Sequence, residues 1–298
     1  MRPCAISAQL RAPDVGLAVT AIEATHLAEV GEFLHRNLNK RIAPEAWVQS
    51  LTHPWSETRP NFGMQLRDET TLVGVFCAIY SDQTIDGRVE RFCNPHSWCV
   101  LESHRRHGIG LILTLLKQTG YHFTMLTPNP KVAEIFRGLR FKDLAKAMVV
   151  FPNLPSLAGG LPGRFIETDP NAIANRLSGT AKRDFELHRE IPWLRFLVFG
   201  RGTQSCLVVY KRDRWKRLPC ARIIHVSHPE VLDRNRGLLH NGLLRSGLLV
   251  SKVESRFLLR EPRIAYRMQR TQGKLFLSRT LQDRQIRDLY SELASLDV

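Results

Sequence analysis

The stretch Trp98-Cys99-Val100-Leu101-Glu102-Ser103-His104-Arg105-Arg106-His107-Gly108-Ile109-Gly110 decides the fold. Its apolar start predicts a strand that ends near Leu101. The run from Gly108 to Gln118 predicts a buried helix, because it is apolar on most sides. The basic turn between them can hold an anion, since glycines let backbone N–H groups approach a ligand, a helix N-terminus is partly positive and arginines bind phosphate. A pyrophosphate is the expected ligand.

Two familiar phosphate-binding motifs differ from this turn. It lacks the Lys-Ser/Thr pair with which a P-loop holds the terminal phosphates and Mg²⁺. It also lacks the first glycine of G-x-G-x-x-G and an evident ribose-binding acid after a following strand. Nucleotide hydrolysis and dinucleotide binding are therefore both disfavoured.

Hydrophobic periodicity extends the prediction to the whole first half of the chain. We expect strands and helices in an order that begins with antiparallel strands and continues with a β-α-β crossover, which indicates a mixed α/β sheet with helices on both faces. The expected strands are 17–22, 62–66, 71–80, 97–101, 121–126 and 147–151, and the expected helices cover 30–38, 44–51, 108–118 and 130–137.

Residues 152–163 are rich in proline and glycine, which is typical of a linker. We therefore expect domains at 1–151 and 164–298. The second half repeats the order of the first, with a helical lead-in at 169–190, a hairpin of 195–199 with 205–210, a strand at 221–226, a helix at 229–246 and a strand at 248–253. A strand-prone basic segment (256–277) and a final helix over 283–296 follow.

The charge of the chain is uneven. Of 298 residues, 43 are Lys or Arg and 28 are Asp or Glu, which gives +15. Residues 1–150 hold 17 basic and 14 acidic residues (+3), and residues 151–298 hold 26 and 14 (+12). The basic excess of the second half is compatible with an anionic acceptor. A nucleic-acid partner is possible but not favoured, because the basic residues are spread over strands and turns.

Several protein classes are excluded by the sequence. No apolar run is long enough for a membrane span. Arg11, Pro13 and Asp14 interrupt the first nineteen residues before the apolar region of a secretory signal can form, so we expect a cytoplasmic protein. Six cysteines occur without a C-x-x-C pair, which predicts reduced, buried thiols and no metal site. They are Cys4, Cys77, Cys93, Cys99, Cys206 and Cys220.

At its central motif the chain resembles the GNAT acyltransferase superfamily, whose members typically have V-x-P-x-x-R-x-x-G-I-G at the turn that binds the pyrophosphate of coenzyme A. The matching residues are Val100, Arg105, Gly108, Ile109 and Gly110, with Glu102 where the family often has proline. The family commonly continues with an Asn, a Tyr in a short helix and L-G-F. Asn129, Phe136 and Leu139-Arg140-Phe141 stand at those places.

The resemblance covers residues 15–150, and it implies a CoA-binding domain followed by a degenerate second copy. It implies that the backbone of Cys99 to Leu101 holds the pantetheine arm. The remaining cofactor contacts that it implies are Arg105, Arg106, His107, Gly108, Ile109, Gly110, Asn129 and Phe136. At the position of Phe136 the family often has a Tyr that protonates the thiolate, and phenylalanine has no such proton.

Attack of an amine on a thioester needs a base. The candidates are His96, Glu90 and Glu102. Each has a structural alternative: His96 follows the turn-forming pair Asn94-Pro95, Glu90 can pair with a neighbouring arginine, and Glu102 can pair with the arginines of the turn. The second copy has Val226-Ser227-His228-Pro229-Glu230 at its crossover, without a glycine pair, and we expect it not to bind CoA.

Three functions follow from the resemblance. The first is an acyl-CoA-dependent N-acyltransferase, in which the amine of a small-molecule or anionic acceptor attacks the thioester directly, without an acyl-enzyme on Cys99. The second is a Fem-like peptidyltransferase that uses aminoacyl-tRNA, in which case the basic half would bind RNA. The third is an acyl-CoA-binding protein without catalytic activity, which Phe136 would permit.

Overall fold

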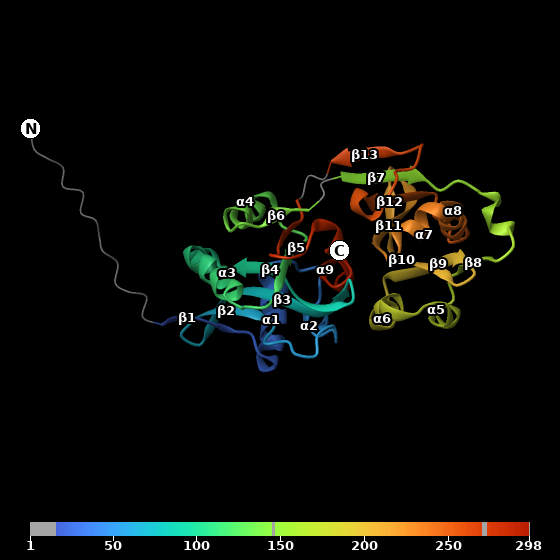
Figure 1. The fold of residues 1–298 in the computed structure, drawn as a ribbon. Helices are drawn as coiled ribbons and strands as arrows, with labels where there is room; N and C mark the ends of the chain where they lie inside the picture. Colours follow the sequence, from blue (N-terminus) through green and yellow to red (C-terminus); the bar gives the residue numbers. More distant parts are fainter. Residues whose placement is uncertain (1–15, 145–146, 270–272, 298) are drawn as a thin grey trace, which may run out of the picture.

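The computed structural model describes residues 16–144, 147–269 and 273–297. Two sheets of seven strands lie side by side (Figure 1). The C-terminal segment (residues 283–297), which includes helix α9 (Glu292–Ser295), lies between them. No helix in these ranges has the length and the apolar character needed to cross a membrane.

The first sheet has the strand order β1-β2-β3-β4-β5-β14-β6. Only the pairing of β4 with β5 is parallel; all its other neighbours are antiparallel. The strands are β1 (Leu17–Ala21), β2 (Gly63–Asp68), β3 (Thr71–Ile85), β4 (Arg88–Val100), β5 (His122–Met125), β14 (Leu275–Leu277) and β6 (Lys142–Asp143).

The second sheet has the strand order β8-β9-β10-β11-β12-β7-β13, in which only β11 and β12 are parallel neighbours. The strands are β8 (Arg164–Glu167), β9 (Leu194–Arg201), β10 (Gln204–Trp215), β11 (Leu218–Val226), β12 (Val250–Glu254), β7 (Ala147–Pro152) and β13 (Tyr266–Gln269).

The two sheets have the same architecture. From β1 across the first sheet and from β8 across the second, neighbouring strands form three antiparallel pairs, then one parallel pair, then two antiparallel pairs. Each also has a bulge at the equivalent place, between Phe76 and Cys77 on β3 and between Val209 and Tyr210 on β10. The predicted fold class, two tandem copies of a mixed α/β sheet flanked by helices, is confirmed.

Helices cover both faces of each sheet because alternate strand residues point to opposite faces. On one face of the first sheet, Val30 and Trp47 of its helices pack with Val75 and Cys77, and on the other face Leu111 packs with Phe76. The helices of the first copy are α1 (Leu27–Asn37), α2 (Pro44–Leu51), α3 (Gly108–Leu116) and α4 (Pro130–Gly138). Those of the second are α5 (Pro170–Arg176), α6 (Gly179–His188), α7 (Pro229–Arg234) and α8 (Arg236–Arg245).

Short 3-10 helices complete the secondary structure. They are η1 (Ala24–His26), η2 (Glu102–His107), η3 (Leu157–Gly160), η4 (Ser255–Phe257) and η5 (Asp283–Gln285). The predicted helix over 229–246 is two helices that meet at Asn235, and β8 was not predicted.

Each half of the chain contributes one strand to the sheet of the other half. The strand at 147–151, predicted to complete the first half, is β7 and pairs with β12 and β13 of the second sheet. Conversely, β14 lies between β5 and β6 of the first sheet. The physical reason is packing, because Val149 and Phe151 on one face of β7 belong to the core around α7 and α8, and Val150 packs on the opposite face.

The prediction of one helix over 283–296 is wrong. The structure has η5 and the four-residue α9 there, joined by irregular chain. A helix in this place would present one apolar face, but the segment is buried on several sides: Leu289 and Ala294 belong to a core shared by both sheets, and Ile286 and Leu293 pack beside β14. Contacts on both sides therefore outweigh the helical periodicity.

The cysteines of the described ranges are buried and form no disulfide bond, as predicted. They are Cys77, Cys93, Cys99, Cys206 and Cys220. Cys4 lies outside the described residues.

Candidate active site

The turn before α3 is wound as the 3-10 helix η2, so the helical path begins at Glu102, before both glycines. The N–H of His104 donates to the carbonyl of Leu101 (2.9 Å), and the N–H of Gly108 donates to the carbonyl of Arg105. These donors are occupied within the turn itself. An anion here would therefore first meet the basic side chains and the positive end of the helix dipole.

The arginine side chains of η2 lie at the surface. Arg105 is paired only loosely with Glu102 (3.4 Å), and both side chains are largely exposed. Arg106 donates to His107 (2.7 Å), and His104 bonds Asp68 of β2 (3.2 Å). An exposed pair such as Arg105–Glu102 is worth little, so Arg105 can exchange it for a phosphate at small cost.

The two glycines differ in their surroundings. A Cβ on Gly108 would lie 3.0 Å from the Trp98 ring and 3.3 Å from Val100, whereas a Cβ on Gly110 would find its nearest atom, in Val19, at 3.7 Å. Gly108 has ordinary right-handed helical geometry (φ −58°). Its missing side chain therefore lets α3 approach β4, and Gly110 is the glycine with open space. Ile109 between them is exposed.

Strands β4 and β5 separate beside this turn. Their pairing stops at Cys93 and Phe123, and beyond it Asn94 reaches across to the carbonyl of Thr124 (3.0 Å). Three residues later β4 bulges at Ser97, which has a positive φ of 54°. The end of β4, including Cys99 and Val100, is thus paired with β3 alone.

Two ring nitrogens on β4 are buried without a hydrogen-bond partner among the residues that the structure describes. They are Nε2 of His96 and Nε1 of Trp98, which flank the bulge. Cross-strand pairing places His96 beside Cys77, on the face of α1 and α2, and Trp98 beside Phe76, on the face of α3. Buried polar groups are rarely left unpaired, so these two nitrogens fit a polar ligand held along the open edge of β4.

His96 differs from its predicted surroundings. Asn94 and Pro95 are buried strand residues and form no turn, so the alternative of a loop histidine is wrong. His96 Nδ1 lies 2.8 Å from Ser97 Oγ. Burial lowers the pKa of His96 to about 3, so its imidazole is neutral at physiological pH.

The other two candidate bases lie elsewhere. Glu90 is six residues from His96 along β4, roughly 20 Å at the rise of a strand, and it binds His122 (3.0 Å). Glu102 is exposed beside Arg105. The structure therefore brings neither carboxylate to His96 and the bulge.

The downstream residues of the motif have structural roles as well. The Asn129 side chain caps α4 by accepting from the N–H of Val132 (2.9 Å). Phe136 is fully buried and packs on Phe76 and Phe141, with ring centroids 6.1 and 4.9 Å away.

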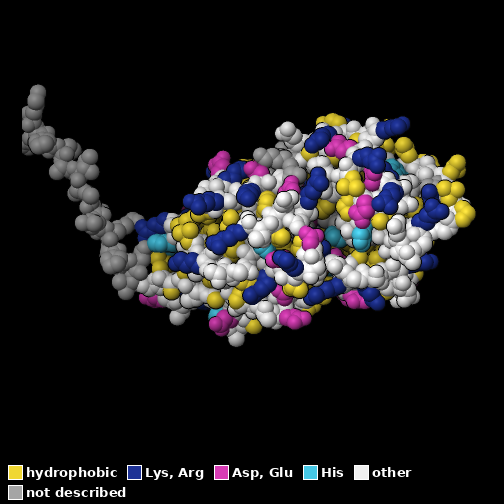
Figure 2. Space-filling view, viewed as in Figure 1, with side chains coloured by type: hydrophobic (Ala, Val, Ile, Leu, Met, Phe, Trp, Pro, Cys, Tyr) yellow, Lys and Arg dark blue, Asp and Glu magenta, His cyan; other side chains and the backbone are white. Residues whose placement is uncertain are grey.

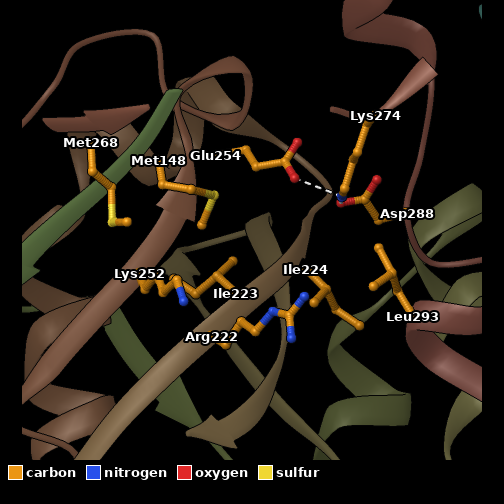
Figure 3. Close-up of a pocket in the computed structure, with 10 residues that line it drawn as sticks. All are labelled: Met148, Arg222, Ile223, Ile224, Lys252, Glu254, Met268, Lys274, Asp288 and Leu293. Carbon is orange, nitrogen blue, oxygen red and sulfur yellow. Dashed lines mark hydrogen bonds and ion pairs between the residues drawn. The ribbon is translucent and has the colours of Figure 1, made fainter. Parts of the chain in front are cut away.

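A cavity of about 210 Å³ lies between the second sheet and the C-terminal segment. Two methionines lie at one end and Lys274 with Asp288 at the other, with Arg222 and Lys252 between (Figure 3). Within the described part of the chain, the Arg222 side chain has no hydrogen bond or ion pair, and Lys252 Nζ is 3.8 Å from Asp213. The lining residues are Met148, Arg222, Ile223, Ile224, Lys252, Glu254, Met268, Lys274, Asp288 and Leu293.

A group of four buried charges lies at one end of this cavity, and three of them, Glu254, Lys274 and Asp288, line it. Arg256 bonds Glu254 (2.7 Å) and Asp288 (2.6 Å), and Lys274 bonds Glu254 (2.6 Å) and also Asp288. The quartet has equal numbers of cations and anions, so its charges compensate one another. The positive surplus of the cavity is therefore supplied by Arg222 and Lys252.

The second copy has no equivalent of the basic turn. Ser227 and His228 lead into α7, which has Pro229 in its first turn and Glu230 beside it. The N-terminal end of this helix therefore carries an acid where the first copy carries arginines. That this copy does not bind CoA stays a prediction.

Sequence reasoning missed Glu292. Its side chain is 3% exposed, its Oε1 accepts from Thr127 (2.7 Å), and its N–H donates to Asn94 (3.3 Å). Glu292 thus lies where β4 and β5 separate. It is 198 residues from Asn94 in the chain, and no local pattern could have linked the two.

Comparison with solved structures places this architecture among known folds. A GCN5-related N-acetyltransferase from Anabaena variabilis matches with a TM-score of 0.56 at 10% identity, over 87% of this chain and 72% of that chain. A probable N-acyltransferase from Enterococcus faecalis matches with a TM-score of 0.59 at 11% identity over the same shares. A GCN5-related N-acetyltransferase from Kribbella flavida matches with 0.55 at 16% identity, over 89% of this chain and 72% of that chain.

No protein-family model matches the sequence, and no curated protein matches it. The likeness is therefore one of fold, carried by the two sheets and their helices. This chain has the GNAT acetyltransferase fold, in two tandem copies that exchange one strand each.

Proposed function

We propose that this protein is an acyl-CoA-dependent N-acyltransferase, which transfers an acyl group, most simply acetyl, to the amine of an anionic acceptor. The observation that carries the proposal is the separation of β4 from β5 beside the basic turn of α3, with ring nitrogens of His96 and Trp98 at the bulge that have no partner among the described residues. An extended ligand with a diphosphate at one end and a polar thioester at the other suits both features.

In this proposal the pyrophosphate of CoA binds at η2 and the start of α3. Arg105 and Arg106 supply the charge, with His107 beside them and the Gly108-Ile109-Gly110 backbone at the helix start. The pantetheine arm runs along the open edge of Cys99 to Leu101, towards Ser97. The side chains of Asn129, which caps α4, and of Phe136, which is buried in the core, have structural roles, so any contact of these two residues with CoA is indirect.

In this proposal the acceptor binds in the cavity of Figure 3, between the second sheet and the C-terminal segment. Arg222 and Lys252 favour a carboxylate or phosphate on the acceptor, and the methionines favour an apolar body. A cavity of about 150 Å³ is known to hold benzene. The 210 Å³ here therefore has room for a small branched or aromatic group.

Direct attack of the amine on the thioester fits the residues at the site better than an acyl-enzyme. Burial raises the pKa of the Cys99 thiol, so the thiolate needed for covalent catalysis is disfavoured. Neutral His96 can accept or donate a hydrogen bond through its free Nε2. The buried Phe136 ring cannot supply a proton to the leaving thiolate, which must take one from the reacting amine or from water.

A binding experiment tests the cofactor part of the proposal. Acetyl-CoA at one hundred times its Kd should stabilise the protein by about 2.7 kcal/mol in thermal unfolding. Arg105→Gln should weaken binding about tenfold, because it removes one charged phosphate contact. Arg88→Gln, an exposed arginine at the far end of β4, is the matched control and should bind like wild type.

Absence of any stabilisation by acetyl-, butyryl- or myristoyl-CoA would contradict the proposal. Release of CoA thiol in the presence of amino acids, dipeptides and amino sugar phosphates separates an enzyme from a protein that only binds acyl-CoA. If acyl-CoA has no effect but aminoacyl-tRNA binds with a steep salt dependence, the Fem-like alternative holds instead.

A further inference from the structure

The C-terminal segment buries polar groups as well as apolar ones. Ser291, Glu292 and Ser295 are each less than 4% exposed, although the segment lies next to the end of the described chain. Apolar packing accounts for Leu289 and Leu293 but not for these residues, because burial of a polar group is unfavourable unless it is hydrogen-bonded.

Glu292 is held at the point where β4 and β5 separate. Asn94 binds the Glu292 N–H through its side-chain oxygen and Thr124 of β5 through its side-chain nitrogen, so one amide connects all three segments. Glu292 Oε1 accepts from Thr127, an exposed residue just after β5. The carboxyl group therefore lies directly beneath the surface at the end of β5.

The second carboxyl oxygen of Glu292, Oε2, is buried and has no hydrogen-bond partner in the described ranges. A buried carboxylate oxygen without a donor is costly, and a structural role alone would favour a partner or an apolar residue. Asn94 precedes His96 by two residues on the same face of β4, and His96 Nε2 likewise has no partner in the part of the chain that the structure describes. Two buried polar atoms without a partner in the described ranges, Glu292 Oε2 and His96 Nε2, thus lie near the part of β4 that β5 leaves unpaired.

We propose that Glu292 is the general base of the acyl transfer and accepts a proton from the acceptor ammonium through its free Oε2. This assignment rests on the proposed N-acyltransferase function. It assigns the base to the half of the chain that does not carry the CoA turn.

The electrostatic surroundings support the assignment. Burial raises the pKa of Glu292, while the Thr127 hydrogen bond, the backbone N–H of Glu292 itself and Lys274 lower it, and Asp288 adds a small further increase. His96 on β4 is neutral and adds no charge. A carboxylate with a raised pKa is a stronger base near neutral pH than an exposed one.

The proton and electron balance is simple. Glu292 takes one proton from R–NH₃⁺, and the freed lone pair forms the C–N bond to the thioester carbonyl carbon. The C–S bond breaks with its electron pair on sulfur, and the second amine proton, lost as the amide forms, ends on that thiolate. The products are the amide, CoA-SH and one proton on Glu292, which passes to water and restores the carboxylate.

The test compares four variants with acetyl-CoA and the best amine of the panel above. Glu292→Gln keeps the acceptor atom for Thr127 and should lower kcat at least 100-fold, with the Kd for acetyl-CoA unchanged within threefold. Glu292→Asp should restore part of kcat. Thr127→Val removes the bond that favours the ionised form, so the acid limb of the kcat–pH profile should move to higher pH. Glu134→Gln, an exposed acid on α4, is the control and should behave like wild type.

The outcomes are distinguishable. A Glu292→Gln protein that binds acetyl-CoA and retains wild-type kcat and acid limb overturns the assignment but leaves the N-acyltransferase proposal intact. A parallel loss of acetyl-CoA affinity and melting temperature shows a structural role and overturns it too. Wild-type protein that binds no acyl-CoA and releases no thiol refutes the proposed function, and the assignment fails with it.

Discussion

Gly108 lies against the Trp98 ring in regular helical geometry. Packing against Trp98 and the proposed ligand binding therefore both favour a glycine at this position. The pattern R-x-x-G-x-G could be recognised in the sequence because its residues are contiguous. The role of each glycine could not be recognised in the sequence. A glycine that leaves room for a ligand and a glycine that leaves room for a neighbouring ring are the same residue in the sequence. Only the distances to Trp98 and Val19 separate Gly108 from Gly110.

Substitution of the two glycines should therefore give opposite results. Gly108→Val drives a side chain into Trp98 and should destabilise the fold by about 1–3 kcal/mol. Gly110→Ala has room and should be neutral or stabilise by up to about 1 kcal/mol, because alanine favours a helix. Urea unfolding of both variants checks this. Equal destabilisation by the two would show that α3 does not pack on β4 as described.

At the scale of elements, the exchange of β7 and β14 ties the two halves together. Each strand pairs on both sides within the sheet of the other half. The predicted boundary at 152–163 separates residues in sequence but not in the sheets. Strand 147–151 was recognised from its apolar run, yet an apolar run does not specify which sheet it joins, because both sheets offer it the same kind of neighbour.

The first half expressed alone, residues 1–151, should therefore fail to fold cooperatively. Without β14, strand β5 has an unpaired edge and β6 has no neighbour, and β7 has no sheet. Urea unfolding followed by circular dichroism should show a broad transition or none, whereas co-expression with residues 152–298 should restore a sharp one. A sharp transition of the isolated half would mean that it can form a complete sheet by itself.

Across the whole molecule, one apolar core joins both sheets and buries histidines between them. His188 and His225 lie there, with Trp55 of the first half stacked on His188 at 4.8 Å. Lys and Arg side chains, by contrast, are scattered over both halves of the visible face among acidic ones (Figure 2). The net charge therefore does not define a single binding surface on this face. The histidines buried in the shared core make the stability of the fold sensitive to acid.

Stability should fall between pH 6.5 and about 4. Burial lowers the pKa of His96 and His225 to about 3 and of His188 to about 4, from 6.5. As the pH falls below 6.5 the unfolded chain binds protons that the folded protein does not, so each histidine reduces the free energy of unfolding by up to about 1.4 kcal/mol per pH unit.

Urea unfolding at pH 7 and pH 5 measures this effect, and His225→Gln should flatten the slope by the share of one histidine. A free energy of unfolding that is the same at both pH values would show that these imidazoles are protonated, or reach solvent, in the folded protein.

The sequence by itself determined the fold class, the duplication and the position of the basic turn. Each of these follows from contiguous residues: strand and helix periodicity, the repeated order of elements, and the spacing of Arg105 from Gly108. Tertiary structure decided which sheet receives β7 and β14, why 283–296 is not one helix, and that Glu292 meets Asn94. These depend on contacts across as many as 198 residues. The physical reason is that burial, strand pairing and charge compensation depend on where residues lie in space. Local periodicity in the sequence carries no information about those positions.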